Sequence, residues 1–345
     1  INDFNTGDNF GCDYFQVTEK NGLRCSTAVG YLNPIKKRSN LKIEVKAHVK
    51  QINFQDKKAV SISYWKDGEL ITVKANKEVI LSAGSIGSPH ILQTSGIGDE
   101  KELRDLGIPI IHHNSNIGKN LQDHLMLRPV YKVSNIKTLN KTINSFFGKM
   151  MIGMEFVFFR RGVMTMGASQ LCGFAKSDSS RETPNLQFHV QPISTDRLGG
   201  SNLHNFNAFT PTVANIRPTS RGEVNISSSD SREYPRIKMN YLSTTEDRQV
   251  AAAGIKLIRK IILESQTFKK YNPIEFRPGL EYQSDEEIVR VASDYAQTIF
   301  HPVGTCKMGN DNTSVVSDKL KVHNIENLRV VDASIMPNIT SGNTN

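Results

Sequence analysis

The sequence predicts an α/β fold in two parts, and three observations support this fold class. Residues 41–82 alternate between apolar and polar side chains, which is typical of strands. At residues 79–96 a short apolar run, a glycine turn and a helical segment follow one another, as in nucleotide-binding α/β domains. From about residue 126 the pattern changes to strands and an amphipathic helix, so a second, α+β domain built on an antiparallel sheet is expected.

The first part is expected to contain a β-hairpin and one strand–turn–helix unit. Its strands are predicted at Leu41–Val45, Val49–Phe54, Val60–Tyr64, Ile71–Val73 and Val79–Leu81. The residues Lys66-Asp67-Gly68 have the composition of a hairpin turn. Pro89–Gln93 is predicted as a helix that ends at Ser95-Gly96. In such a unit the ligand lies at the carboxyl end of the strand.

The second part is expected to combine strands with one long helix. Its strands are predicted at Leu127–Val133, Leu186–Gln191, Phe206–Ala214 and Glu223–Ile226. Residues 245–265 are predicted to be helical, because acidic residues precede apolar residues at helical spacing. The later run Leu328–Asp332 is an apolar strand that ends in an acid, which is typical of a dinucleotide-binding domain. We therefore predict a first domain over 1–125, a second over 126–300, and a return to the first over 301–345.

The composition is that of a folded globular chain. Of its 345 residues 38% are hydrophobic and 22% are charged, and no apolar run approaches the ~20 residues of a membrane-spanning helix. Four cysteines, Cys12, Cys25, Cys172 and Cys306, show no CxxC spacing, so free thiols in a reducing, cytoplasmic compartment are expected, with a disulfide as the alternative. The chain starts at Ile1 and stops inside a Gly/Asn/Thr-rich turn, so we expect a fragment.

The net charge of +9 does not indicate a nucleic-acid surface. The basic residues are dispersed apart from Lys36-Lys37-Arg38 and Arg160-Arg161, and no aromatic residues alternate with them. A solvated basic surface is therefore expected. Peripheral contact with an anionic membrane surface is the alternative.

Several classes of enzyme are excluded because their sequence motifs do not occur. The sequence contains no GxGxxG, GxxxxGK[ST], HExxH, CxxC or GxSxG. Its nine histidines are scattered, so no catalytic metal is expected.

Three local patterns remain as candidates for chemistry. The first runs from Ser82 to Gly98, where glycines allow a ligand to approach the backbone and a helix N-terminus favours negative charge. An ordinary strand–helix turn would have the same appearance. The second is the segment from His301 to Gly309. Histidine titrates near neutrality, and Pro302 and Gly304 fix an irregular loop, so His301 is a candidate base, with a structural turn histidine as the alternative.

The third pattern extends from Val330 to Asn345. Asp332, at the end of a strand, is positioned either to accept a hydrogen bond from a cofactor hydroxyl or to cap the following turn. The Asn-rich turn at Ser341–Asn345 offers side-chain and backbone amides.

Together, these patterns resemble the glucose–methanol–choline (GMC) oxidoreductase family, in its choline-dehydrogenase-like branch. Ser88-Pro89-His90-Ile91-Leu92-Gln93-Thr94-Ser95-Gly96-Ile97-Gly98 is similar to the end of the family's second signature. Ile117–Leu125 resembles its VGxNLxDH segment, and Arg217–Gly222 resembles its RPxSRG turn. The resemblance covers essentially the whole chain.

The resemblance implies an FAD-dependent alcohol dehydrogenase or oxidase with an FAD-binding domain, incomplete here, and a substrate-binding domain. His301 falls at the family's catalytic histidine and Asn345 at its second catalytic position. The flavin-lining roles fall on the backbone of Ala83, Gly84, Asp332 and Ala333, and Val49 falls where the family contacts the adenine half. The alcohol and the electron acceptor, oxygen, quinone or other, are left open. A flavoprotein lyase of the same fold and a non-catalytic flavin-fold binding protein are the alternatives.

Two departures from the family pattern have consequences. The segment Gly167–Phe174 contains no carboxylate, whereas choline-type members carry an acid there, so choline is not the expected substrate. The family's GxGxxG does not occur in these 345 residues, so we expect the chain expressed alone not to retain FAD. Visible absorbance of the purified chain checks this, and a monomeric protein with stoichiometric flavin would contradict it.

Overall fold

The computed structural model describes residues 3–7, 9–167, 169–197, 200 and 202–344. The chain forms two compact units. Unit 1 comprises residues 1–43, 125–216 and 245–298, and unit 2 comprises residues 44–124, 217–244 and 299–345. The unit boundaries at 124/125 and 298/299 lie near the changes in sequence pattern at about 126 and 300, and each unit is assembled from three separate stretches of the chain.

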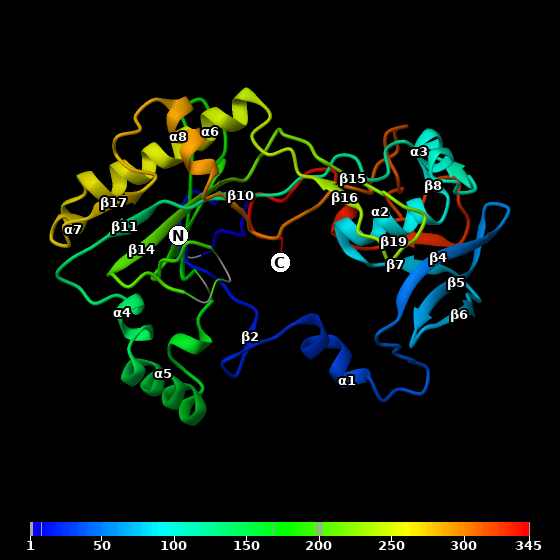
Figure 1. Ribbon diagram of the computed structural model, residues 1–345, viewed down its shortest axis with the longest axis horizontal. Coiled ribbons are helices and arrows are strands. Elements are labelled where there is room, and N and C mark those ends of the chain that lie inside the picture. Colours follow the sequence, from blue (N-terminus) through cyan, green and yellow to red (C-terminus); the bar gives the residue numbers. More distant parts are fainter. Residues whose placement is uncertain (1–2, 8, 168, 198–199, 201, 345) are drawn as a thin grey trace. The chain divides into compact units, whose positions relative to one another are not determined.

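Unit 1 is built on an antiparallel sheet of eight strands (Figure 1). Its main order is β1-β12-β13-β14-β10-β18, and β11 pairs with β14 and β17. The strands are β1 (Gly11–Tyr14), β10 (Leu125–Leu127), β11 (Val130–Lys132), β12 (Leu171–Ala175), β13 (Leu186–Gln191), β14 (Ala208–Asn215), β17 (Ile274–Arg277) and β18 (Gln297–Thr298). A separate short hairpin is formed by β2 (Glu19–Lys20) and β3 (Leu23–Arg24). The predicted antiparallel sheet is thus present, and the predicted strand over 186–191 has the observed bounds.

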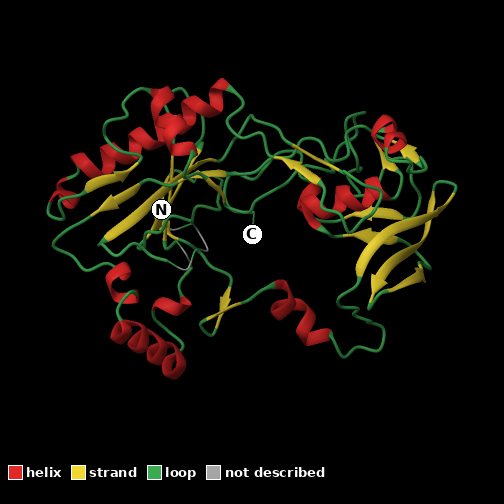
Figure 2. Cartoon of the chain, in the orientation of Figure 1, coloured by secondary structure: helices red, strands yellow, loops and turns green. Residues whose placement is uncertain are grey.

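Some helices of unit 1 cover this sheet and others extend from its end, whereas α1 lies away from it (Figure 2). The helices are α1 (Asn33–Ile35), α4 (Leu139–Ile143), α5 (Phe146–Phe159), α6 (Thr245–Arg259), α7 (Gln266–Lys269) and α8 (Asp285–Ser293), with π-helical turns at Ala28–Leu32 and Lys260–Glu264 and a 3₁₀ turn at Val163–Thr165. The long predicted helix is α6, and its apolar face with Val250, Ile255 and Ile258 is buried. Gly254 lets α6 approach β14 closely, because a Cβ there would lie 3.0 Å from the side chain of Val213.

A buried ion pair lies at the junction of α6 with β11 and β17. Glu275, whose side chain is 0% exposed, accepts three hydrogen bonds from Arg259, at 2.9, 3.0 and 3.3 Å. Tyr131 donates its hydroxyl to the same carboxylate at 2.8 Å, and burial together with Glu275 raises the pKa of Tyr131. Each charged group in this contact therefore has a partner, as burial requires.

Unit 2 contains small sheets around α2 (Gly84–Thr94). A three-stranded sheet is formed by β4 (His48–Gln55), β5 (Lys58–Lys66) and β6 (Glu69–Lys74), and the two-stranded pairs are β7 (Val79–Leu81) with β19 (Leu328–Val330), β8 (Ile97–Gly98) with β9 (His112–His113), and β15 (Glu223–Asn225) with β16 (Arg236–Lys238). The remaining helices are α3 (Glu100–Asp105) and a 3₁₀ turn at Ala333–Ile335. The β7–β19 and β8–β9 pairs are parallel, and an apolar core including Leu81, Leu92 and Val330 fills the space between α2 and the strands.

Two of the local predictions are wrong in instructive ways. Residues 41–45 form no strand: Ile43 is 43% exposed and Val45 66% exposed, so the alternating side chains lack a partner strand. The helix predicted from Pro89 begins five residues earlier, at Gly84. Proline at position 89 removes the N–H that would bond to the carbonyl of Ser85, and the hydroxyl of Thr305 donates to that carbonyl instead at 2.6 Å.

Candidate active site

The structure brings the three candidate sequence patterns together within unit 2. The Ser85 hydroxyl, in the first turn of α2, donates to the carbonyl of Pro302 at 2.6 Å. The backbone amides of Cys306 and Met308 each donate at 2.8 Å to the carbonyls of Ser334 and Ile335. Segments more than 200 residues apart in the sequence are thereby joined by hydrogen bonds around the histidine loop.

Asp332 caps the turn that follows β19. One carboxylate oxygen accepts from the Gly84 amide at 3.0 Å and from the Ser88 hydroxyl at 2.5 Å. The other oxygen accepts from the Ser334 amide at 2.8 Å. Of the two roles considered for this side chain, the structure shows the cap, and the carboxylate also ties the start of α2 to the end of β19.

The residues expected to line the flavin meet at the edge where β7 and β19 end. The two strands are parallel, so their carboxyl ends, followed by Ala83-Gly84 and Asp332-Ala333, lie at the same edge. Gly84 has a φ of +79°, and no atom lies within 4 Å of where its Cβ would be. Ala83 is exposed. The backbone here is therefore open to close approach by a planar ligand, as the expected FAD role of these residues requires.

His301 lies on an irregular loop that is fixed by backbone contacts. Its backbone amide donates to the carboxylate of Asp123 at 2.9 Å. Gly304, three residues later, has a φ of +94°, and a Cβ there would lie 2.5 Å from the carbonyl oxygen of Asn120. His301 therefore lies on an irregular loop whose backbone is held in place, as the sequence predicts.

The ring of His301 contacts a second histidine. Nδ1 of His301 and Nδ1 of His124 are 3.1 Å apart, and the two rings meet edge to face. His124 is fully buried, whereas His301 is half-buried. Burial lowers the pKa of His301 from its ordinary value, and the charge of Asp123 opposes that shift.

Asp123, His124 and Tyr241 are the neighbours of His301 that sequence reasoning did not single out. The Tyr241 hydroxyl donates to the Asp123 carboxylate at 2.5 Å, on the oxygen that does not accept from the His301 amide. A signal for two of them was present, since Asp123 and His124 end the segment Ile117–Leu125 noted for its family resemblance. Tyr241 carries no motif, so only the fold reveals it.

Asn120 and Gln122 connect the histidine loop to the C-terminal segment. The side-chain amide of Gln122 donates to the carbonyl of Pro337 at 3.0 Å, and its oxygen accepts from the Ile339 amide at 3.2 Å. Asn120 donates to Gly304 and Pro337 and accepts from Arg221 at 3.0 Å. These contacts explain why the NLxDH-like and RPxSRG-like segments belong to the same site.

The two other predicted site residues lie apart from this group or outside the description. Val49 is half-buried in β4, where it pairs with Tyr64, and in the part of the chain that the structure describes it shares no hydrogen bond with the histidine loop. Asn345 lies outside the described residues. Within the described ranges, no cluster of three or more His, Cys, Asp or Glu side chains is suited to a metal ion.

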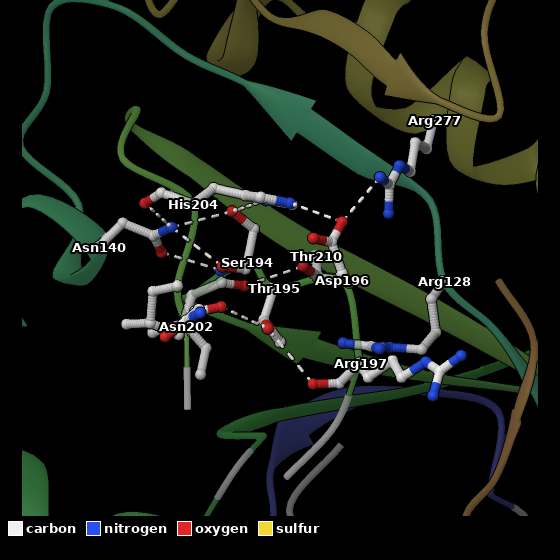
Figure 3. A network of polar contacts seen from close by, with 12 residues as sticks. Arg128, Asn140, Ser194, Thr195, Asp196, Arg197, Asn202, His204, Thr210 and Arg277 are labelled. Carbon is white, nitrogen blue, oxygen red and sulfur yellow. Dashed lines mark hydrogen bonds and ion pairs between the residues drawn. The ribbon is translucent and has the colours of Figure 1, made fainter. Parts of the chain in front are cut away.

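Unit 1 contains a separate polar network around the loop after β13 (Figure 3). Asp196 is paired with Arg277 at 2.7 Å and with the His204 ring at 3.1 Å. Arg128, only 4% exposed, donates to Gln297 at 2.8 Å, and its Nε and Nη2 have no hydrogen-bond partner among the described residues. Burial and the neighbouring Arg277 lower the pKa of Arg128 to about 10, against the opposing effect of Asp196. This part of unit 1 therefore carries a buried positive charge.

The protein has relatives among characterised proteins. It is 39% identical over 346 residues to an alcohol dehydrogenase [acceptor] of Pseudomonas putida, covering 99% of this chain and 62% of the relative. It is 41% identical over 329 residues to an oxygen-dependent choline dehydrogenase of Pectobacterium carotovorum, covering 95% of this chain and 58% of the relative. The chain thus spans about three fifths of the length of the curated relatives it matches.

Solved structures show the same fold. A mutant of the formate oxidase of Aspergillus oryzae, solved to study the effect of the mutation on FAD modification, superimposes with a TM-score of 0.89 at 25% identity over 96% of this chain and 62% of its own. Pyridoxine 4-oxidase from Mesorbium loti matches with a TM-score of 0.84 at 25% identity, over 99% of this chain and 62% of its own. These matches confirm the predicted α/β fold with a substrate domain on an antiparallel sheet, in a family whose cofactor is FAD.

Two models of the same family match the sequence. The N-terminal model of GMC oxidoreductases matches residues 1–126, and the C-terminal model matches residues 218–345. The motifs that suggested this resemblance lie within or next to the matched ranges and converge on His301. The chain belongs to the GMC oxidoreductase family.

Proposed function

We propose that the protein containing this chain oxidises the CH–OH group of an alcohol to a carbonyl, with His301 as the general base. One observation carries the proposal: the ring of His301 is held beside His124 on a loop bonded to the carboxyl edge of β7 and β19. A base is effective when it is positioned and unprotonated near neutral pH. The braced loop provides the position, and burial, which lowers the pKa of His301, favours the unprotonated ring.

The histidine pair defines which tautomer of His301 is reactive. A neutral imidazole carries one proton, so one Nδ1 donates and the other accepts across the 3.1 Å contact. When His301 donates through Nδ1, its Nε2 is a free base and takes the hydroxyl proton of the alcohol. His124 then accepts at its own Nδ1 and orients the ring. The opposite arrangement would leave Nε2 of His301 protonated and inactive as a base.

The other predicted site residues would bind the flavin and stabilise the alcohol oxygen during this proton transfer. The backbone of Ala83, Gly84, Asp332 and Ala333 would line the flavin, and Val49 would contact the adenine half. Bound FAD supplies the redox chemistry by accepting the hydride from the carbinol carbon. The side-chain amide of Asn345 would donate to the alcohol oxygen as negative charge develops on it, without competing for the proton.

A substrate screen on the full-length protein tests the proposal. We expect one class of alcohol to reduce an artificial electron-acceptor dye in a flavin-dependent manner. Conversion of a substrate without reduction of the dye would favour a lyase of the same fold. If no alcohol changes the flavin spectrum, the protein is a binding protein and the proposal is wrong.

Choline is expected to be a poor substrate compared with uncharged primary alcohols. The segment Gly167–Phe174 offers no carboxylate to a trimethylammonium group. Desolvating a quaternary ammonium without a charge or aromatic partner is unfavourable. Ranking kcat/KM over a set of alcohols decides this, and choline at the head of the ranking would contradict it.

The pH dependence of kcat/KM should follow the pKa of His301, which the charge of Asp123 raises. Because the base acts unprotonated, activity should rise with pH through the pKa of His301, which burial lowers. Replacing Asp123 by Asn removes the charge that raises this pKa, so the rising limb of kcat/KM should move to lower pH. Asp105→Asn, on the surface of α3, is the control and should leave the limb in place. A limb that moves to higher pH in the Asp123 variant would exclude His301 as the titrating base.

A further inference from the structure

Helix α5 exposes an apolar face of four turns. Its members share one side of the helix, at spacings of three and four residues, and each is between 39% and 85% exposed: Phe146, Phe147, Met150, Met151, Met154, Val157 and Phe158. Helices of globular proteins usually bury such a stripe. Here none of the fourteen residues of α5 is buried, so its apolar face is directed outward.

The opposite side of α5 anchors it to unit 1. Gly148 permits close contact with α4, because a Cβ there would lie 2.0 Å from the carbonyl oxygen of Thr142. Ser145 caps the N-terminus by accepting from the Gly148 amide, and the 3₁₀ turn at 163–165 follows the C-terminus. The α4–α5 pair extends from the end of the sheet in unit 1 (Figure 1). Helix α5 is therefore attached to unit 1, and its outward side is exposed in this chain.

The surroundings of this face are strongly basic. Residues 133–166 contain one acid, Glu155, and five basic residues, which gives a net charge of +4. These are Lys137, Lys141, Lys149, Arg160 and Arg161, and all five are exposed. The guanidinium groups of Arg160 and Arg161 lie over the rings of Phe156 and Phe159, at 4.8 and 5.0 Å, so two of the cations are held at the C-terminal end of α5.

We propose that the outward face of α5 docks on an anionic lipid surface. Its Phe and Met side chains would enter the acyl boundary, while the surrounding Lys and Arg would contact lipid phosphates. With fourteen residues α5 is about 21 Å long, shorter than the ~30 Å core of a bilayer, so it would lie in the plane of the interface. In the described part of the chain no helix is long and apolar enough to span a membrane, which agrees with a peripheral mode of binding.

The positive charge around α5 favours an anionic membrane over a second copy of the chain as the binding partner. Two copies that met through α5 would bring together two segments 133–166, each with a net charge of +4, so self-association there is opposed by repulsion. An anionic membrane complements both properties of the face at once, its apolar stripe and its basic border. An acidic protein partner would complement the basic residues, but it would not account for the exposed phenylalanines at both ends of the apolar face.

The experiment is vesicle flotation of the full-length flavoprotein. We expect it to float with vesicles of phosphatidylcholine and phosphatidylglycerol, and much less with phosphatidylcholine alone or at high salt. The double variant Phe147→Ser/Phe158→Ser should lower partitioning by about tenfold or more for each ring removed. Lys141→Gln/Lys149→Gln should lower it by about fivefold for each charge, on anionic vesicles only.

A matched double variant controls for apolar surface in general. Tyr31→Ser/Tyr234→Ser removes two other exposed rings, 77% and 91% exposed, and should float like the parent protein. Flavin content and thermal stability of all variants should equal those of the parent, because the replaced side chains are exposed. Three results would overturn the proposal: no flotation of the parent, equal flotation of the Phe147/Phe158 variant, or a parent dimer that this variant converts to monomer without any vesicle binding.

Discussion

Replacing His301 by Ala should slow flavin reduction by the alcohol by about 10²–10⁴-fold while FAD remains bound, since this is the usual contribution of a positioned general base. The side chain can be removed without disturbing the loop, because the contact that fixes the loop to Asp123 is made by the backbone amide. The edge of β7 and β19, where we propose that the flavin binds, is likewise held by hydrogen bonds among Gly84, Ser88 and Asp332, not by the imidazole. Rapid mixing of the anaerobic variant with substrate gives the rate of the chemical step.

A matched control separates the base from a histidine in general. His113→Ala removes an exposed ring that accepts a hydrogen bond from the Glu100 amide, and it should reduce flavin at the parent rate. A His301→Ala protein that still reduces its flavin at close to the parent rate would show that another group takes the proton.

Replacing Glu275 by Ala should destabilise the protein by about 3–5 kcal/mol, the usual cost of breaking a buried ion pair by removing one partner. The variant would leave the guanidinium of Arg259, 10% exposed, without its carboxylate, and would also remove the acceptor for the Tyr131 hydroxyl and the Gly279 amide. The loss affects the junction of α6 with β11 and β17. Denaturant unfolding of the full-length flavoprotein measures it.

The control for this prediction is an exposed ion pair in the same unit. Glu246, 44% exposed, pairs with Arg181 at 2.8 Å, and Glu246→Ala should cost about 1 kcal/mol or less. Equal effects of the two variants would show that the buried network contributes no more than a surface pair.

Much of the fold was predictable because its signals are local. The strands and turn of the hairpin in β4–β6 follow from alternation and from Lys66-Asp67-Gly68, and the apolar spacing of α6 predicted the long helix. Helix α5 was not predicted, because most positions of its sequence FFGKMMIGMEFVFF are apolar and the few polar residues mark no clear helical period. The strand predicted at 41–45 failed because alternation alone does not supply a partner strand.

The candidate site was predictable only in its separate pieces. His301 and Asp332 could be selected because proline, glycine and a strand end mark their surroundings in the sequence. The contact of His301 with His124 joins residues 177 positions apart, and no local pattern encodes it. The capping role of Asp332 was one of two open interpretations, and three hydrogen bonds to its carboxylate show it, while a bond from a cofactor hydroxyl stays a prediction.

The most direct test of the central claim is anaerobic reduction of the full-length flavoprotein by an alcohol deuterated at the carbinol carbon. If His301 takes the hydroxyl proton and the carbinol hydrogen leaves as hydride, the flavin absorbance should bleach without added acceptor, one aldehyde or ketone should form per flavin, and deuterium should slow the bleaching. If product forms while the flavin stays oxidised, or if no alcohol bleaches the flavin at all, the protein is not the alcohol oxidoreductase proposed here.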